Sequence, residues 1–419
     1  MFVSALLLVT LSFVLWTSNQ KKILRIEVYA GSSWDVPNSR ENRVLDNIIR
    51  QFEKSHPQVR VVYESGIPKK DYDGWLAEKI LKGEQPDVFM VPENDFSMLA
   101  ASGAFKSLDS LLSKDEVAAY YPVAYQAGQY QGHSYALPIE SNPVMMCVNK
   151  DLLEKEGVSI PDSNWTLEDL YAICQKVTKD TNGDGLIDQY GITDYTWKQA
   201  LVAYNGHLRN QSGVNVDSAE MHQALSFISK LTSLNQRYKV TSNDFDEGKV
   251  AFYPMSLAQY RTYKPYPYHV AKYSRFSWTC IPMPAAKAGI PATQVKTSLF
   301  AMSSKTKQDK LAWEFMKLLC QNQKNQQELF AKSQGTSVLT SVVKSSQTKK
   351  ILQADDFGLD SLTSQRLDHM MKHSVLDISR DLDYHSLERL DYLLGNALKN
   401  NEIDSILPSI QREMEETGK

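Results

Sequence analysis

The chain has 419 residues, of which 42% are hydrophobic and 23% charged, and its formal net charge is −3. This length exceeds what one compact core usually holds, so we expect a soluble globular protein with two domains. The nearly balanced charge lacks the basic face that nucleic-acid binding requires, which excludes nucleic acid as a partner.

The first sixteen residues, Met1 to Trp16, are almost wholly apolar. This run is shorter than the roughly 20 residues of a spanning helix, and it is typical of a secretory signal or a short uncleaved anchor. No positive charge precedes the apolar run, whereas Lys21 and Lys22 follow it. A buried core helix is the alternative interpretation of the run. We expect segment 1–22 to direct export to the extracellular face of the cell membrane and to remain there as an anchor.

Strands and helices are expected to alternate from residue 23 onward. Residues 23–29, 59–63 and 85–91 have the apolar patterns of strands, and the segments between them carry the apolar stripes of helices. Such alternation predicts an α/β fold, in which helices cover both faces of a mainly parallel sheet. Ligands of such sheets bind beyond the carboxyl ends of the strands, so loops 31–38, 64–70 and 92–95 are candidate binding loops.

The chain is expected to cross into a second lobe near residue 140. Two short apolar segments, 135–139 and 144–148, flank this point, and residues 282–291 have the composition of a linker. Residues 298–302 are typical of a strand that returns to the first lobe. We therefore assign 23–139 plus 293–338 to lobe 1, and 140–292 plus 339–419, whose last part is expected to be helical, to lobe 2.

Residues 180–191 form an acidic loop with regularly spaced oxygen donors. The donors at positions 1, 3, 5, 7 and 9 are Asp180, Asn182, Asp184, the carbonyl of Leu186, and Asp188. Gly185 stands at position 6, where a calcium loop turns sharply, but Gly191 replaces the bidentate Glu of an EF-hand at position 12. The spacing predicts a structural Ca²⁺ site, and a turn-rich loop between a helix and a strand is the alternative.

The four cysteines lie far apart and lack metal-ligand spacing. Cys147 and Cys320 stand inside apolar runs. The sequence therefore predicts small buried hydrophobic residues rather than disulfides.

Several short motifs occur in a characteristic order: 52–59, 86–91, 99–105, 135–138, 148–153, 244–252 and 310–316. In this order the chain resembles the extracellular solute-binding proteins of family 1, the carbohydrate-binding components of ABC importers. The resemblance implies a two-lobed, class II periplasmic-binding-protein-like fold with about three crossovers, which closes on its ligand like a clamshell. It also implies a membrane permease as partner, and we expect a monomer. No lipid-accepting Cys follows the apolar run, so an anchor helix would take the place of the lipid.

A sugar presents hydroxyls around an apolar ring face, so its site needs aromatic platforms together with carboxylates, amides or hydroxyls. We expect the ligand to be held by loop residues of both lobes. They are Trp34, Asp35, Glu93, Asn94, Glu140, Ser141, Trp197, Tyr253, Met255, Tyr260, Thr297 and Ser298. The alternatives are a packing role for Trp34, a helix cap at Asp95 and a solvated hinge turn at residues 140–141.

Two other functions compete with sugar capture. A glycoside hydrolase needs two carboxylates beside the scissile bond, which Asp35, Glu93 and Glu140 could supply, but the chain carries no nucleophile elbow, metal-protease motif or phosphate loop. A binding protein for a peptide, a polyamine or a similar solute is the stronger alternative. We expect a non-enzymatic substrate-binding component of an ABC importer that requires no cofactor.

Overall fold

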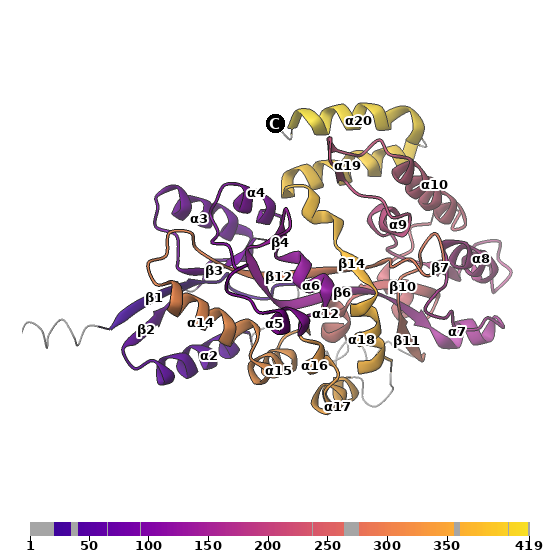
Figure 1. Cartoon of the computed structure of the whole chain (residues 1–419). Helices are drawn as coiled ribbons and strands as arrows, with labels where there is room; N and C mark the ends of the chain where they lie inside the picture. Colours follow the sequence, from indigo (N-terminus) through magenta and orange to yellow (C-terminus); the bar gives the residue numbers. More distant parts are fainter. Residues whose placement is uncertain are drawn as a thin grey trace, which may run out of the picture.

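Figure 1 presents the computed structural model of the chain, with lobe 1 on the left and lobe 2 on the right. The structure describes residues 21–34, 41–64, 66–92, 94–236, 238–263, 276–355, 361–400 and 402–417. Residues 1–20 of the predicted export segment and the predicted ligand residues Asp35 and Glu93 lie outside these ranges. Within them, no helix combines the length and the apolarity needed to cross a bilayer.

A single ten-stranded sheet extends through both lobes within the described ranges. Its main path runs in the order β2-β1-β3-β12-β6-β10-β7, while β11 and β13 pair with β6 and β14 pairs with β12. The strands are β1 (Lys22–Glu27), β2 (Val59–Val62), β3 (Val88–Val91), β6 (Ala136–Asn149), β7 (Tyr190–Ile192), β10 (Val250–Ser256), β11 (Trp278–Ile281), β12 (Thr293–Met302), β13 (Thr336–Ser337) and β14 (Ser374–Leu376). Two small hairpins stand apart: β4 (Gln129–Tyr130) with β5 (His133–Ser134), and β8 (Arg209–Asn210) with β9 (Gly213–Val214).

The longest strand, β6, carries the chain from lobe 1 into lobe 2. Its beginning pairs with β12, where Leu137 is opposite Phe300, and its end pairs with β10, where Val148 is opposite Phe252. The sequence predicted two short apolar segments on either side of a crossing near residue 140, with a solvated hinge turn as the alternative. The structure has one continuous strand instead, because β12 and β13 supply pairing partners on both sides of that stretch.

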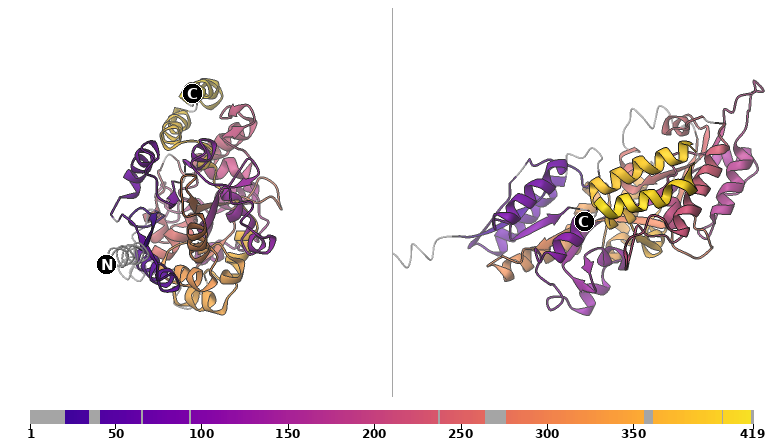
Figure 2. Two further views of the ribbon diagram at one scale, coloured as in Figure 1. Left: turned by 60° about the vertical axis from the view of Figure 1, so that its left-hand side comes forward. Right: turned by 90° about the horizontal axis from the view of Figure 1, so that it is seen from above.

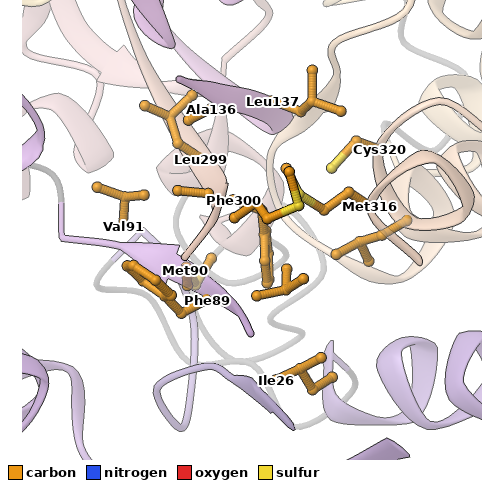
Figure 3. Packing of buried hydrophobic residues seen from close by; sticks show 14 of the residues in the cluster. Ile26, Phe89, Met90, Val91, Ala136, Leu137, Leu299, Phe300, Met316 and Cys320 are labelled. Atoms are coloured by element: carbon orange, nitrogen blue, oxygen red, sulfur yellow. The ribbon is translucent and has the colours of Figure 1, made fainter. Parts of the chain in front are cut away.

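Lobe 1 places helices on both faces of its part of the sheet (Figure 1). Figure 3 shows how Phe89 and Val91 of β3, Leu299 and Phe300 of β12, and Met316 pack together in its core. The return of the chain thus completes a core that the N-terminal strands begin. The helices are α2 (Glu41–Ser55), α3 (Lys69–Leu81), α4 (Phe96–Ala101), α5 (Lys114–Ala118), α6 (Pro122–Ala127), α14 (Asp309–Cys320) and α15 (Gln323–Lys332).

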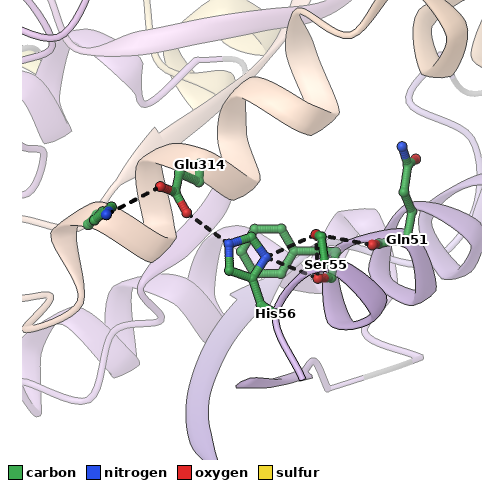
Figure 4. A network of polar contacts seen from close by, with 6 residues as sticks. Gln51, Ser55, His56 and Glu314 are labelled. Carbon is green, nitrogen blue, oxygen red and sulfur yellow. Dashed lines mark hydrogen bonds and ion pairs between the residues drawn. The ribbon is translucent and has the colours of Figure 1, made fainter. Parts of the chain in front are cut away.

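A polar contact also fastens the return segment to lobe 1 (Figure 4). His56, directly after α2, stacks on Phe52 with ring centroids 4.2 Å apart. Its Nε2 lies 2.9 Å from Oε2 of Glu314 on α14. The two helices are therefore joined by both apolar and polar contacts.

Lobe 2 is built around the far half of the same sheet. A capping box begins α8 (Leu167–Val177), because the Thr166 hydroxyl accepts the backbone N–H of Asp169 and the Asp169 side chain accepts the backbone N–H of Thr166. The helices of its first part are α7 (Lys150–Lys155), α8 (Leu167–Val177), α9 (Trp197–Ala203), α10 (Ala219–Ser233), α11 (Ser242–Asp246) and α12 (Leu257–Tyr263).

The C-terminal region is mostly helical, as expected, but it also contributes strands β13 and β14. β14 pairs in parallel with the start of β12, where Thr293 is opposite Ser374, and so brings a third segment to the boundary between the lobes. The last two helices lie side by side over α9 and α10 (Figure 2). The helices of this region are α16 (Thr340–Val343), α17 (Ser346–Asp355), α18 (Ser364–Lys372), the 3₁₀ helix η1 (Ile378–Asp381), α19 (Tyr384–Asn400) and α20 (Ile403–Thr417).

Candidate ligand-binding cleft

The strand ends of the two lobes face each other across the crossing strands. Val91, the last residue of β3, is opposite Leu299 of β12, and Ser256, the last residue of β10, is opposite Val144 of β6. Residues 140–143 of β6 and 295–298 of β12 lie between the end of β3 and the end of β10. Because ligands of α/β sheets bind beyond the carboxyl ends of the strands, the candidate cleft faces these crossing residues.

Glu140 is a buried carboxylate at the centre of the crossing, with 3% of its surface exposed. Its Oε1 accepts the backbone N–H of Gly335 at 2.7 Å and the hydroxyl of Ser333. Burial raises the pKa of Glu140, whereas these hydrogen bonds and the nearby Arg261 act in the opposite direction. Glu140 thus joins the first crossing to Ser333 and Gly335, which lie close to the third crossing at the end of segment 293–338. It is therefore not the solvated hinge turn that was the alternative.

Arg261, on α12 of lobe 2, completes this buried network. Its guanidinium donates to the carbonyl oxygens of Phe330 at 2.8 Å and Gly335 at 3.0 Å. It also donates to Oδ2 of Asp355 at 3.1 Å and lies over the Phe330 ring, 4.6 Å from its centroid. A guanidinium with this many partners is held in one position, so the buried polar network at the crossing is rigid.

Trp34 lies next to Glu140, and only 8% of it is exposed, so its role as a ligand platform stays a prediction. Its indole N–H has no hydrogen-bond partner within the described residues, although it lies close enough to Glu140 to favour the charged carboxylate. A mostly apolar cavity of about 70 Å³ lies on the lobe 1 side of Glu140, and its lining consists of Glu140 and lobe 1 residues such as Ile48 and Phe300 of the core. An indole donor beside a carboxylate acceptor is the kind of arrangement that can orient a hydroxyl-bearing ligand.

The other crossing residues predicted to bind ligand occupy different surroundings. Ser141 is fully buried, and its hydroxyl is 2.9 Å from that of Thr297 on β12. Ser298 is 8% exposed, and a bulge separates it from Leu299. Asn94, three residues after the end of β3, is half-buried. The hydroxyls of Ser141 and Thr297 therefore satisfy each other, which leaves them less available to a ligand.

Three predicted ligand residues lie in hydrophobic cores instead of the cleft. Met255 and Tyr260 are each 1% exposed and pack in the cluster that holds β6, β10 and β11. Trp197 is 5% exposed in the cluster beneath α19 and α20, and its indole N–H donates to Oδ1 of Asp391 at 2.7 Å. The structure does not bring Trp197 to Trp34 or Glu140. Local sequence could not indicate this burial, because the C-terminal helices that cover Trp197 are remote in the chain.

Tyr253 is the predicted aromatic of lobe 2 that stays partly accessible. It is half-buried and packs against Phe245 with ring centroids 5.3 Å apart. Burial raises the pKa of Tyr253 to about 12, and the nearby Asp194 adds to this effect. Tyr253 therefore presents a neutral hydroxyl close to the strand ends.

Two acidic residues at the strand ends were not predicted as ligand residues. Asp194 follows β7 with a left-handed backbone at φ 52°, and partial burial raises its pKa. Asp95 follows β3 and makes no capping hydrogen bond to α4, contrary to the alternative considered above. Burial, together with the nearby carboxylates of Asp73 and Asp383, raises the pKa of Asp95 to about 6. Their places directly after strands would have identified both residues.

The acidic loop at 180–191 is closed on its own backbone. The Asp180 carboxylate accepts the N–H groups of Asn182, Gly183 and Gly185 at 2.7–3.1 Å, and these bonds lower its pKa, that from Gly185 most strongly. Asp188 pairs with Thr181. Within the described ranges, no group of three or more His, Cys, Asp or Glu side chains is arranged to hold a metal ion. This geometry matches the turn-rich alternative, and calcium binding stays a prediction.

Comparison with known proteins connects this architecture to solute capture. A maltotriose-binding protein of Pyrococcus abyssi is 25% identical over 138 residues, which is 33% of this chain and 30% of that protein. An uncharacterized ABC transporter extracellular-binding protein of Pyrococcus horikoshii is 26% identical over 141 residues, which is 33% of this chain and 32% of that protein. The chain thus spans about a third of the length of these two relatives.

The solved structures establish the fold. The sugar-binding protein MalE from Xanthomonas citri superposes with a TM-score of 0.75 at 16% identity, over 94% of this chain and 97% of that chain. The predicted α/β periplasmic-binding-protein fold is therefore confirmed. A family model described as bacterial extracellular solute-binding protein matches residues 47–355, most of the chain. This protein belongs to the bacterial extracellular solute-binding protein family.

Proposed function

We propose that the protein is the substrate-binding component of an ABC importer and that it captures a sugar or oligosaccharide between its lobes. One observation carries the proposal: the indole of Trp34 lies beside the buried carboxylate of Glu140 where the chain first crosses between the lobes. Aromatic faces and carboxylates are what a neutral ring with many hydroxyls requires. The maltotriose-binding relative and the sugar-binding structural neighbour support the same ligand class.

Closure of the lobes is the proposed mechanism. A ligand bound to one lobe meets groups of the other lobe only when the cleft is closed, so binding shifts the population toward the closed form. Glu140 and Arg261, which both bind Gly335 at the crossing, would stay fixed while the lobes move. The closed form then presents its surface to the permease. Small-angle scattering should show a smaller radius of gyration with saturating ligand, and an unchanged radius would contradict closure.

The ligand class is tested by calorimetric titration with maltotriose. We expect Trp34→Ala and Glu140→Gln each to weaken binding by roughly tenfold or more, because an aromatic contact or a charged hydrogen bond contributes about 1–3 kcal/mol. Trp313→Phe is the matched control, since Trp313 is a buried core residue of α14. Equal losses in all three variants would indicate general destabilisation and would contradict the proposed site.

A cationic solute such as a polyamine is the second candidate. Asp95 of lobe 1 lies near enough to Asp73, and to Asp383 of the C-terminal segment, for the charges of both carboxylates to raise its pKa. Facing carboxylates attract ammonium groups. Spermidine should then bind more tightly than maltotriose, and Asp95→Asn should weaken spermidine binding alone.

We further propose that segment 1–22 exports the protein and anchors it to the membrane, with the domain on the extracellular side. The extracellular character of the family supports export. The anchor is tested by fractionating cells that express the full chain and cells that express the variant Leu6→Asp/Leu7→Asp, in which the apolar run is interrupted. The parent should sediment with membranes, and a parent found wholly in the medium would refute anchoring.

A further inference from the structure

Two cysteines that are remote in sequence stand directly opposite each other in lobe 2. Cys147 on β6 pairs with Cys280 on β11 in an antiparallel ladder, and their sulfur atoms are 3.6 Å apart. Both side chains are fully buried. The other two cysteines, Cys174 and Cys320, belong to two other hydrophobic clusters.

The backbone at this pair has the spacing that a disulfide requires. The N–H of Cys280 donates to the carbonyl oxygen of Ser361 at 2.9 Å, so it points away from β6. Since the N–H and C=O of a strand residue point to the same side, Cys147 and Cys280 form a non-hydrogen-bonded pair, in which the Cα atoms are about 4.5 Å apart. Disulfides span Cα separations of roughly 4.4–6.8 Å, so the strands need no rearrangement.

We propose that Cys147 and Cys280 form a disulfide in the exported protein. The family is extracellular, and thiols outside the cell are not kept reduced by the cytosolic glutathione and thioredoxin systems. From the sequence we expected buried thiols rather than disulfides, because these cysteines are 133 residues apart and become neighbours only through the sheet register.

The bond forms by thiol–disulfide exchange with a disulfide oxidant of the exported compartment. The thiolate of one cysteine attacks a sulfur of the oxidant, which releases one thiol and leaves a mixed disulfide. The second thiolate then displaces the remaining oxidant sulfur. The two cysteines lose two electrons and two protons in total, and the oxidant is reduced to two thiols. Because both sulfurs are buried in the folded lobe, the exchange takes place before β11 has settled against β6.

The disulfide would fasten the edge of lobe 2 to the crossing strand. β11 leads through residues 282–292 to β12, the second crossing, so the bond joins the lobe 2 ends of two crossings. It closes a long loop that contains most of lobe 2, which restricts the unfolded chain strongly. The bond lies within one lobe, so it should affect stability and leave ligand affinity unchanged.

Counting of thiols tests the proposal directly. The full chain is exported into an oxidising compartment, purified without reductant, denatured in excess N-ethylmaleimide and weighed by mass spectrometry. Of the four cysteines, we expect two to be labelled before reduction and four after it. Peptide mapping should find Cys147 linked to Cys280. Four labels without reduction, or a link between another pair, would overturn the proposal.

Variants separate the bond from simple packing of the thiols. The double variant Cys174→Ala/Cys320→Ala keeps the pair and should take no label before reduction and two after it. Reduction should lower the melting temperature of this variant and of the parent by roughly 5 °C or more. Reduction should not change the melting temperature of Cys280→Ala. Should Cys280→Ala fail to fold, the label count of the double variant still decides.

Discussion

Gly335 lies against the buried carboxylate of Glu140, so its replacement by alanine tests how rigid the crossing is. A Cβ at this position would stand 2.5 Å from Oε1 and 2.6 Å from Cγ of Glu140. The carboxylate cannot move away freely, because Ser333 and the Gly335 N–H both bind its Oε1. Overpacking costs about 1–3 kcal/mol, and a lost hydrogen bond to a charged group about 1.5–3 kcal/mol. We expect Gly335→Ala to lower the free energy of unfolding by about 3–5 kcal/mol in total.

Urea denaturation measures this loss, and two further variants test its cause. Gly395→Ala, at a helical position in α19 with no atom within 4 Å of the added Cβ, should gain about 0.5–1 kcal/mol. In Glu140→Ala the atoms that clash are gone, so the double variant Gly335→Ala/Glu140→Ala should lose about 2 kcal/mol less than the sum of the single losses. Additive losses, or a parent-like Gly335→Ala, would refute the argument.

Three further predictions concern a buried acid, a buried indole and the acidic loop. Burial raises the pKa of Glu27 from 4.5 to about 7, so the stability that its protonated form provides is present below about pH 4.5 and is lost as the pH rises through 7. In Glu27→Gln the midpoint of urea unfolding should depend less on pH over this window. A pH dependence equal to that of the parent would contradict this prediction. Trp197→Phe should cost about 1.5–3 kcal/mol through the lost bond to Asp391, with ligand affinity unchanged in calorimetry; a large loss of affinity would restore Trp197 to the ligand site. Ca²⁺ should raise the melting temperature of the parent and not that of Asp180→Ala/Asp184→Ala, and no rise in the parent would leave the loop as a turn-rich connection.

Much of the fold is encoded in local patterns and could be predicted. The strand expected at 23–29 is found at Lys22–Glu27, and that expected at 59–63 at Val59–Val62. In both cases the apolar periodicity of a few residues decides the structure. The continuity of β6 and the presence of the three-residue strand β14 were missed, because both depend on pairing with β12, and the paired residues are more than 150 apart in the sequence for β6 and 81 apart for β14.

The candidate site was predicted only in part, for the same reason. Glu140 and Trp34 were identified from their places after strands, and the structure brings them together. The partners that fix Glu140, at Ser333 and Gly335, are almost 200 residues further along, and so is Asp391, which holds Trp197. Local sequence cannot show whether such a residue faces a ligand or a distant segment of its own chain.

The interleaved path of the chain has a consequence for secretion. The core of the first lobe contains Leu299, Phe300 and Met316, and so it cannot be completed while the translocation machinery still holds the second half of the polypeptide. The N-terminal strands of lobe 1 therefore stay partly unstructured until more than two thirds of the chain has been synthesised. This delay keeps the chain unfolded enough to pass through a translocation channel. It also leaves the N-terminal segment exposed to chaperones on both sides of the membrane.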